Sequence, residues 1–531
     1  MPGTKRLIAL IPFRYCYAIV SLLILCGTAA FAQKRAKVFE EFTEDPLKSI
    51  LPDFSYAGYG NNEKEIPLSR APVFDVTTFG AVAGDPLSDR AAIEEAIRAA
   101  VKHGSGIVYF PAGRFLVNED SDQPVSIVIP AGNIVFKGEG SGQGGTELFM
   151  KNPLPPANPV QMWTSPPMFQ FSPSLKDKYI GRLSASAAKG TFVIRVKEAK
   201  GIEPGDWLML RMQNNASELI QKEMGIHKAD TAWTGLVKNG VQVKEVHRVK
   251  SIRNNLITLS SPLCYSADTA YKWEVYKFGN SREVGVEDIN FAGNWRQPFV
   301  HHRSAMDDSG WTMIRFSRLT DSWIRNCRFT DVNIAATIAA GANISVLNCL
   351  ISGNAGHEAI CNNGATNVFL GNITDEAGMF HSVGTNGGSM NTVVWRCKYP
   401  AVTSFESHSS QPRNTLLDCV EGGLQYNRGG GSVQNMPNHM SNLILWNYKQ
   451  TNEPFNPFDF WPQKKRYWRI PAPVIVGFHG ASTTFIREQL QYEESTGQPV
   501  SPASLFEAQL ERRLKKLPEW LISQLNIYEH K

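Results

Sequence analysis

The segment IRNCRFTDVNIAATIAAGANISVLNCLI, residues 324–351, contains one short strand pattern twice, as IRNCRF and again as VLNCLI. Five similar segments lie before and after it in the chain. The intervals are 22, 23, 25, 22 and 28 residues if the equivalent positions are Cys327, Cys349, Asn372, Cys397, Cys419 and Asn447. Repeats in the low twenties with aliphatic strands are typical of the coils of a parallel β-helix. The sequence therefore predicts an all-β solenoid.

The cysteines of this repeat are predicted to form a ladder along the solenoid axis. Stacked inward-facing cysteines act as small apolar fillers, so we expect Cys327, Cys349, Cys397 and Cys419 to be buried, reduced and stacked. A metal site would favour a Cys-x-x-Cys pair, which their spacing lacks. Cys264 and Cys361 fall outside the pattern.

A second, polar ladder follows the first by seven to eleven residues. Counting on from successive rung positions reaches, in order, His357, His381, Glu406 with His408, and Tyr426 with Arg428. A loop between Trp295 and Trp311 is inserted at the same register, and it carries His301, His302 and Arg303. Histidines that recur at one register with Arg and Tyr predict a functional cleft on one face.

The N-terminal part carries a recognisable motif. It has the stretch FGAVAGD at 79–85, an amphipathic helix from about Arg90 to Lys102 with Ser88 or Asp89 as N-cap, and GIVYFPAG at 106–113. This order resembles the N-terminal motif of the pectate-lyase-like superfamily. The resemblance implies a right-handed parallel β-helix whose open end is covered by that helix. It leaves the reaction open, because the superfamily includes lyases, hydrolases, esterases and tailspikes.

The remaining patterns divide the chain. Short alternating strands separated by turn residues predict a small inserted β-domain at 186–277 with a structural role. An amphipathic helix after Ser504 is predicted to cover the last exposed rung. The predicted parts are a leader (1–32), a lead-in segment (33–71), the N-terminal cap with the first coils (72–185), the inserted domain (186–277), the main coils with the groove (278–480) and a C-terminal helical cap (481–531).

Composition and the first residues bear on location and partners. The chain has 531 residues, of which 42% are hydrophobic, and this excludes a disordered protein. The net charge is only +5, which does not indicate a nucleic-acid partner. A basic start, an apolar run over 15–31 and Ala30-Phe31-Ala32 match a cleaved signal peptide, so we expect an exported protein, periplasmic or secreted, with no membrane span after cleavage.

A groove along a β-helix suits an extended polymer, and the residue types in it suit elimination from a uronic acid. The predicted function is a polysaccharide lyase that cleaves an acidic, uronate-containing glycan by β-elimination. Histidine can take the C5 proton near neutral pH, and arginine can pair with the carboxylate. The candidate catalytic residues are His381, His408, Arg428 and Tyr426, and the candidate substrate-binding residues are His357, Glu406, Arg413, His301, His302 and Arg303.

Two other functions stay open. A glycoside hydrolase needs two carboxylates, and candidates include Glu358 and Glu406. The pectin hydrolases of the superfamily carry Asn-Thr-Asp and Gly-His-Gly motifs, whereas this chain has only Gly356-His357-Glu358 as a partial match. A non-catalytic glycan-binding protein is the second alternative. Calcium-dependent relatives use clustered acids, for which Glu406 and Asp375 are a sparse set, so no metal ligand is assigned and Ca2+ remains an open cofactor.

Overall fold

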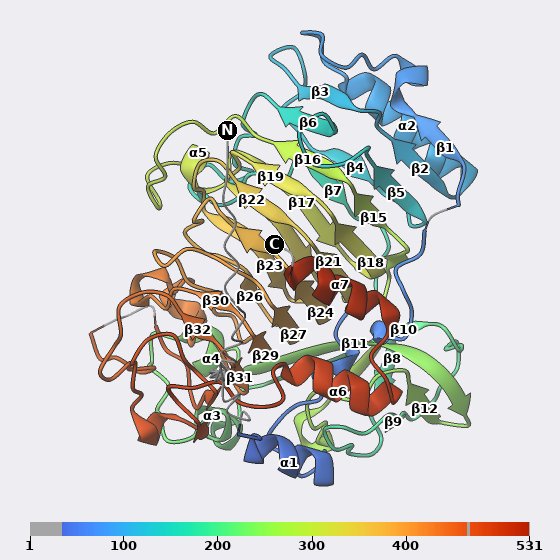
Figure 1. Cartoon of the computed structure of the whole chain (residues 1–531). Helices are drawn as coiled ribbons and strands as arrows, with labels where there is room; N and C mark the ends of the chain where they lie inside the picture. The colour runs from blue at the N-terminus through green and yellow to red at the C-terminus, as the bar shows by residue number, and fades with distance from the viewer. Residues whose placement is uncertain (1–33, 69, 465–467, 530–531) are drawn as a thin grey trace, which may run out of the picture. The chain divides into compact units, whose positions relative to one another are not determined.

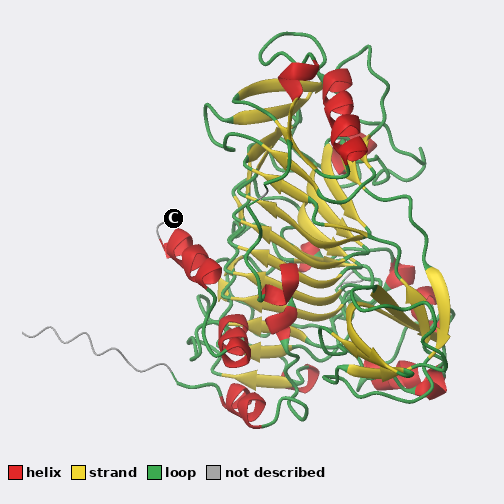
Figure 2. Ribbon diagram, turned by 90° about the vertical axis from the view of Figure 1, so that its right-hand side faces the viewer, coloured by secondary structure: helices red, strands yellow, loops and turns green. Residues whose placement is uncertain are grey.

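A computed structural model describes residues 34–68, 70–464 and 468–529 of the chain. The predicted signal peptide lies outside these residues. The described residues form three parallel sheets that run side by side along a solenoid, which confirms the predicted parallel β-helix (Figures 1 and 2). Within them, no helix is both long enough and apolar enough to cross a membrane.

The first sheet is the longest and runs the whole length of the solenoid. Its strands, in spatial order, are β1 (Val73–Asp75), β2 (Gly106–Tyr109), β5 (Ile134–Lys137), β15 (Gly285–Glu287), β18 (Leu319–Arg325), β21 (Ala342–Leu347), β24 (Thr366–Gly371), β27 (Met390–Trp395), β29 (Arg413–Asp418), β31 (Leu443–Trp446), β33 (Val474–Val476) and β34 (Tyr492–Glu494). A short strand, β14 (Ser281–Arg282), also pairs with β18.

The other two sheets complete each coil. The second contains β3 (Gly113–Asn118), β6 (Thr146–Met150), β16 (Ile289–Ala292), β19 (Arg328–Thr330), β22 (Leu350–Ser352) and β25 (Thr374–Asp375), and β30 (Glu421–Gly422) pairs separately with β32 (Lys449–Gln450). The third contains β4 (Ile127–Ile129), β7 (Phe169–Phe171), β17 (Thr312–Ser317), β20 (Ile334–Ala339), β23 (Glu358–Asn363), β26 (Gly384–Asn386) and β28 (Glu406–Ser407). Aliphatic and Phe side chains from all three sheets fill the space between them.

Strand register confirms part of the cysteine ladder and corrects the rest. In the first sheet Arg325, Leu347, Gly371, Trp395 and Asp418 are paired in succession. The residues two positions further on are Cys327, Cys349, Ile373, Cys397 and Val420, and all of them are buried core residues. Three of the four predicted cysteines therefore form the inward ladder.

Cys419 lies on a neighbouring ladder instead. It aligns with Asn326, Asn348, Asn372 and Asn447, at a position where φ is 54° for Cys419 and 47–55° for the four asparagines. Asparagine tolerates this left-handed conformation better than most residues, and here the Asn372 amide also donates to Asn348 Oδ1 at 2.6 Å. Cys419 is half-buried, so the prediction that it is a buried core residue was wrong by one residue of register.

The N-terminal cap forms as predicted. Helix α2 (Arg90–His103) buries the apolar face predicted for it, which includes Ile93 and Ile97. Asp89 precedes the helix, but its carboxylate accepts from the backbone N–H groups of Val82 and Leu116, at 2.8 and 2.7 Å. Asp89 therefore holds the two flanking segments together rather than capping the helix.

The inserted domain is a separate six-stranded antiparallel sheet, ordered β8-β13-β10-β11-β12-β9. Its strands are β8 (Lys178–Arg182), β9 (Val193–Arg195), β10 (Trp207–Asn214), β11 (Val241–Arg253), β12 (Leu256–Leu259) and β13 (Glu274–Lys277), with helices α3 (Ser217–Met224) and α4 (Thr234–Val237). The sheet begins at Lys178, before the predicted boundary of 186, because β8 pairs with β13.

The C-terminal helices do not cover the last rung. Helices α6 (Leu505–Leu514) and α7 (Glu519–Glu529) lie on the outer face of the first sheet (Figure 1). The Phe506 ring stacks on Phe369 at 4.6 Å between centroids, and Glu507 accepts from the Trp395 indole N–H at 2.8 Å. Large apolar side chains that point outward from the first sheet explain this position, because the helices bury them. Ser504 is the N-cap, as predicted.

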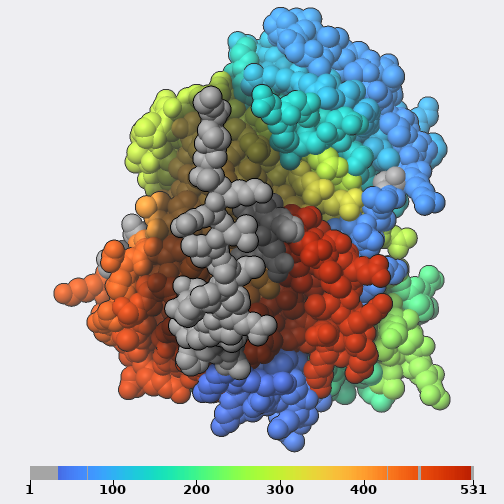
Figure 3. All heavy atoms as spheres, viewed as in Figure 1, coloured from blue at the N-terminus to red at the C-terminus, as the bar shows by residue number. Residues whose placement is uncertain are grey.

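The lead-in segment, described for residues 34–68, lies on the same face and runs opposite to the order of the coils. It begins beside the last coils with α1 (Lys37–Glu44), where the backbone N–H of Ala36 donates to Ser501 O at 2.7 Å. It then passes Asn367, whose carbonyl accepts from Gly58 N at 3.0 Å, before it enters β1. Figure 3 shows its first residues (dark blue) against the C-terminal residues (red).

Candidate active site

The third sheet positions the polar ladder. His357 directly precedes β23, His381 bridges to Glu358 one coil further on, and Glu406 begins β28 where it pairs with Gly384. Because consecutive strands of a parallel sheet stack at about 4.8 Å, side chains from these coils lie close together.

The 295–311 loop folds over the same place. Trp295 and Trp311 are buried, and the Trp295 indole N–H donates to Ala355 O at 2.8 Å, so the loop is anchored at its ends. At its tip, helix α5 (Ala305–Asp308) begins at the N-cap Ser304. The loop brings His301 to 5.2 Å from His357, measured between ring centroids.

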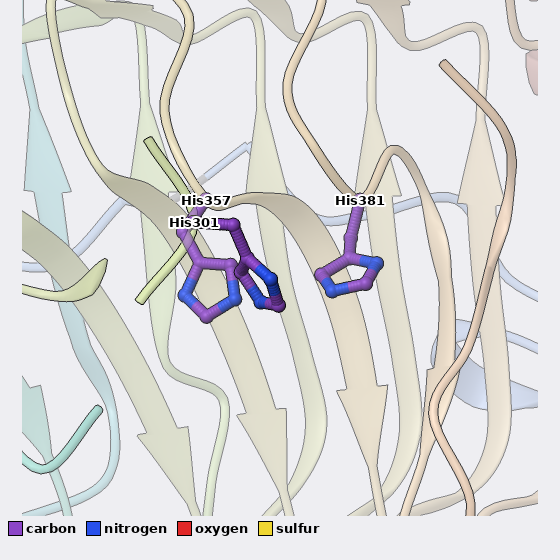
Figure 4. Close-up of side chains that lie close together, drawn as sticks. All are labelled: His301, His357 and His381. Atoms are coloured by element: carbon purple, nitrogen blue, oxygen red, sulfur yellow. The ribbon is translucent and has the colours of Figure 1, made fainter. Parts of the chain in front are cut away.

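Five histidines are thus neighbours. The ring centroids of His381 lie 5.4 Å from those of His357, 5.9 Å from His301 and 5.1 Å from His408. The His302 ring is tilted against that of His301, with 3.7 Å between centroids. Figure 4 shows His301, His357 and His381 facing one another beside the sheet. The structure therefore brings together the histidines that the sequence register placed on one face.

Backbone carbonyls fix the tautomers of two of these rings. His357 Nδ1 lies 2.9 Å from Asp308 O, and His381 Nδ1 lies 3.0 Å from Arg428 O. Because a carbonyl can only accept, each Nδ1 carries the proton and each Nε2 has a free lone pair. Nε2 of His381 is buried and has no hydrogen-bond partner among the described residues. Burial, the largest cause, lowers the pKa of His357 to about 4 and of His301 to about 3, so both rings are neutral at pH 7.

A carboxyl pair lies on the other side of His381. Glu406 Oε1 is 2.6 Å from His408 Nδ1, and Glu406 Oε2 is 3.9 Å from His381 Nδ1. The Glu406 side chain is 0% exposed, whereas that of His408 is 24% exposed. Burial raises the pKa of Glu406 well above its usual range and lowers that of His408. Burial, together with the nearby Glu406, also raises the pKa of Glu358 to about 8, so Glu358 is protonated at neutral pH.

A cavity of about 390 Å3 opens beside this cluster. It is lined by Gln297, Pro298, Phe299, His301, Asn354, Ala355, Gly378, Phe380 and Arg428. The Arg428 guanidinium lies 4.3 Å from the centre of the Phe380 ring and donates to Val402 O at 2.9 Å. Burial lowers the pKa of this guanidinium, and a half-buried cation on an aromatic wall is suited to pair with an anionic group in the cavity.

Arg413 was predicted to bind substrate, and this was wrong. Its side chain is 1% exposed and pairs with Glu223 in α3 of the inserted domain, with Nη2 2.9 Å from Oε2. It also donates to the carbonyls of Gln242 and Gln411, each at 2.9 Å. Arg413 therefore joins the inserted domain to the solenoid.

Tyr426 was predicted to be a catalytic residue, and its surroundings contradict this. Its ring stacks on Phe458 at 4.4 Å, and its hydroxyl accepts from the backbone N–H of Asp459. Burial raises its pKa to about 12. The hydroxyl is thus turned towards the 455–460 loop.

The other loop residues stabilise the loop itself. Arg303 pairs with Asp307 at 2.6 Å, and His302 Nδ1 lies 2.5 Å from Asp308 Oδ2. Asp308 therefore contacts both His302 and His357, a role that its sequence position did not indicate. The sequence also missed Trp163, which is 55% exposed and whose ring lies 5.9 Å from that of His302.

The donor atoms around the cluster do not fit calcium, which takes six to eight oxygen ligands. The groups that could share an ion among the described residues are His301 with His357 and His381, His381 with Glu406 and His408, and Glu358 with Cys361 and Glu406. The other predicted calcium candidate, Asp375, accepts from the backbone of Gly378 and Met379 and is 1% exposed. Asp375 therefore stabilises a turn.

The fold and the sequence agree on the class of protein: the chain is a pectate-lyase-like protein with a right-handed parallel β-helix. Residues 73–164 match the family described as rhamnogalacturonase A/epimerase, pectate lyase-like. Residues 378–524, which include His381, Glu406, His408 and Arg428, match a family described as a domain of unknown function, DUF4955. No curated protein matches the sequence.

Three of the solved structures similar to this chain are as follows. The tailspike protein gp49 of Pseudomonas phage LKA1 is 12% identical, with a TM-score of 0.43 over 80% of this chain and 79% of that chain. PfbA, a surface adhesin of Streptococcus pneumoniae, is 11% identical, with a TM-score of 0.39 over 77% and 79%. The gp54 tailspike of Acinetobacter baumannii bacteriophage AP22, solved with a capsular saccharide, is 11% identical, with a TM-score of 0.37 over 80% and 69%.

Proposed function

We propose that this protein is an exported polysaccharide lyase that cleaves an acidic, uronate-containing glycan by β-elimination. The observation that carries the proposal is the pairing of the partly exposed His408 with the fully buried Glu406. Because burial keeps this imidazole neutral, it can accept a proton at neutral pH. His381 is 1% exposed and is less suited to reach a substrate.

The elimination would use three side chains. Nε2 of His408 takes the C5 proton, the electron pair forms the C4–C5 double bond, and the C4–O bond breaks. Protonated Glu358, whose pKa is raised to about 8, donates its proton to the leaving oxygen. Arg428 at the cavity wall pairs with the uronate carboxylate and stabilises the charge that develops on it.

Hydrolysis is less well supported by the carboxyl pair. Oxygens of Glu358 and Glu406 lie within 4.8 Å of each other, which is closer than the roughly 6.5–9.5 Å of inverting enzymes. A retaining enzyme would need both groups to face the sugar, and Glu406 has no exposed surface. The pair thus suits proton handling better than attack on a glycosidic carbon.

The test is to incubate the protein without its leader with a panel of uronate polymers and with neutral glycans. A lyase produces an unsaturated ring, so ultraviolet absorbance rises together with the reducing ends. Reducing ends without absorbance would show a hydrolase. Retention on a glycan without any cleavage would show a binding protein. Either of these results would overturn the proposal.

A further inference from the structure

We propose that His301, His357 and His381 form a binding site for a transition-metal dication such as Zn2+, with one coordination position open towards the cavity. One ligand atom from each ring lies within 4.8 Å of the others. The rings come from the 295–311 loop and from two successive coils, so three separate segments converge on one point (Figure 4). The inference does not depend on the proposed lyase activity, which uses other side chains.

The contacts of the outer ring nitrogens support a metal rather than a packed histidine core. Histidines that bind metals almost always donate their other ring N–H to a carbonyl or carboxylate, which orients the ring and fixes the tautomer. His357 and His381 do this through Asp308 O and Arg428 O, at 2.9 and 3.0 Å. Both rings therefore have an unprotonated Nε2 available for an ion.

The lone pair on His381 lacks any other explanation. Its Nε2 is buried, has no hydrogen-bond partner among the described residues, and belongs to a side chain that is 1% exposed. A buried acceptor without a partner is costly, and a coordinated cation would remove that cost. In Figure 4, one nitrogen of His381 faces the other two rings, while the second faces away from them.

The ligand type and access define the class of ion. Neutral imidazoles favour Zn2+, Cu2+, Ni2+ or Fe2+ over Ca2+ and Mg2+, which prefer oxygen. Three protein ligands with a free fourth position are typical of catalytic rather than structural zinc sites. His301 also lines the 390 Å3 cavity, so the free position is next to the space that a ligand could fill. Glu406 lies on the other side of His381, with Oε2 3.9 Å from the Nδ1 that faces Arg428 O, so it is not counted among the ligands.

Metal content provides the test, without any substrate. Tag-free protein is stripped with a chelator, dialysed, and titrated with Zn2+ and with Co2+, while calcium serves as the comparison ion. We expect one equivalent of Zn2+, a visible Co2+ spectrum typical of nitrogen ligands, and a higher melting temperature with Zn2+ but not with Ca2+. Uptake of less than about a tenth of an equivalent would overturn the proposal.

Variants identify the ligands. His301→Ala removes a half-buried ring at the cavity. It should weaken Zn2+ binding by at least about 100-fold, which is more than the loss of a group that only hydrogen-bonds to a ligand usually costs. His357→Gln tests a buried ring, and its fold is checked by circular dichroism. His103→Ala, on the exposed end of α2, is the control and should bind as the unaltered protein does. Unchanged affinity in His301→Ala would overturn the proposal even if His357→Gln fails to fold.

The two proposals fail separately. If the protein takes up Zn2+ but does not cleave uronate polymers by elimination, the proposed metal site stands and the proposed lyase activity is overturned. If the protein cleaves uronate polymers by elimination but takes up no metal, the lyase proposal stands and the metal site is overturned.

Discussion

Nδ1 of His408 lies 2.6 Å from Oε1 of Glu406, a carboxyl group with no exposed surface. This contact orients the imidazole, so that its Nε2 is left for a substrate. We expect His408→Ala to lower the turnover of uronate elimination at least about 100-fold, the usual contribution of a general base. The melting temperature should change little, because His408 is partly exposed. Initial rates of absorbance increase check this, with His103→Ala as the control, and near-normal turnover would exclude His408 as the base.

Arg428 should act on binding and on the transition state together. Arg428→Lys keeps the charge but loses the planar fork that pairs with a carboxylate. We expect kcat/KM on a uronate polymer to fall by about tenfold or more in Arg428→Lys, and further in Arg428→Ala. A neutral methyl-esterified polymer serves as the comparison substrate. An equal loss on both substrates would contradict a role in carboxylate recognition.

The Arg413–Glu223 pair should hold the inserted domain on the solenoid. Arg413 is 1% exposed, so removing its partner leaves a buried charge. We expect Glu223→Gln and Arg413→Met each to lower the free energy of unfolding by about 3–5 kcal/mol, and the double variant to lose less than the sum. Urea unfolding of the four proteins measures this. Additive losses would show that the two residues act independently.

Cys419 offers a stabilising substitution. It has φ of 54° on a ladder where four other coils have asparagine, and its thiol contacts Ala503 O at 2.9 Å. Cys419→Asn should raise the free energy of unfolding by about 0.5–1 kcal/mol, because asparagine adopts the left-handed conformation at lower cost and can donate to the same carbonyl.

The matched control is Cys397→Asn, one of the inward cysteines. It places an amide in the apolar core and should lower the free energy of unfolding by about 2 kcal/mol or more. If the two variants have the same effect, the ladder assignment in the structure is contradicted.

His439 should make the fold sensitive to acid. It is completely buried, donates to Met440 O and accepts from Thr415, and burial lowers its pKa to about 4. In the unfolded chain the pKa is about 6.5, so between these values only the unfolded state binds the proton. Stability is therefore complete above pH 6.5 and falls as the pH drops towards 4. From pH 7 to 5 this group should cost about 2 kcal/mol.

Chemical denaturation at a series of pH values measures this effect. The slope of the unfolding free energy against pH measures the number of protons taken up on unfolding. In His439→Gln this number should be about one lower between pH 5 and 6. An unchanged slope would show that other groups, including the clustered histidines, account for the acid sensitivity.

The solenoid and the capping helix were predictable from the sequence, because coil length and helical periodicity are local properties. The cysteine ladder was predicted correctly for Cys327, Cys349 and Cys397, but an Asn-Cys pair can align through either residue. Backbone conformation decides the choice: Cys419 takes the left-handed turn position, where four other coils have asparagine and the preceding coil has Arg396. The spacing between repeats does not show which residue of an Asn-Cys pair faces the core.

Some residues of the candidate site could likewise be predicted from coil length, and others could not. His357, His381 and His408 lie together because each follows from the coil length. Arg413 was predicted from its residue type alone and does not follow that count. Its partner Glu223 comes from the inserted domain 190 positions away, and a spacing rule carries no information on that contact. Trp163 and the contact of Asp308 with His357 were not predicted, because loops from different coils bring these residues to the histidines.

The reversed course of the lead-in segment has a consequence for how the molecule comes apart and is made. A solenoid whose coils touch only their neighbours can fray from either end, one coil at a time. Here Lys37 N donates to Glu494 across a separation of 457 residues, and Gly58 N donates to Asn367 O. The last coils therefore cannot unfold without detaching the lead-in segment. This segment links the last coils to the middle of the solenoid, so the coils at that end do not unfold one at a time. During synthesis, the segment made first must wait for its partners until the chain is almost finished.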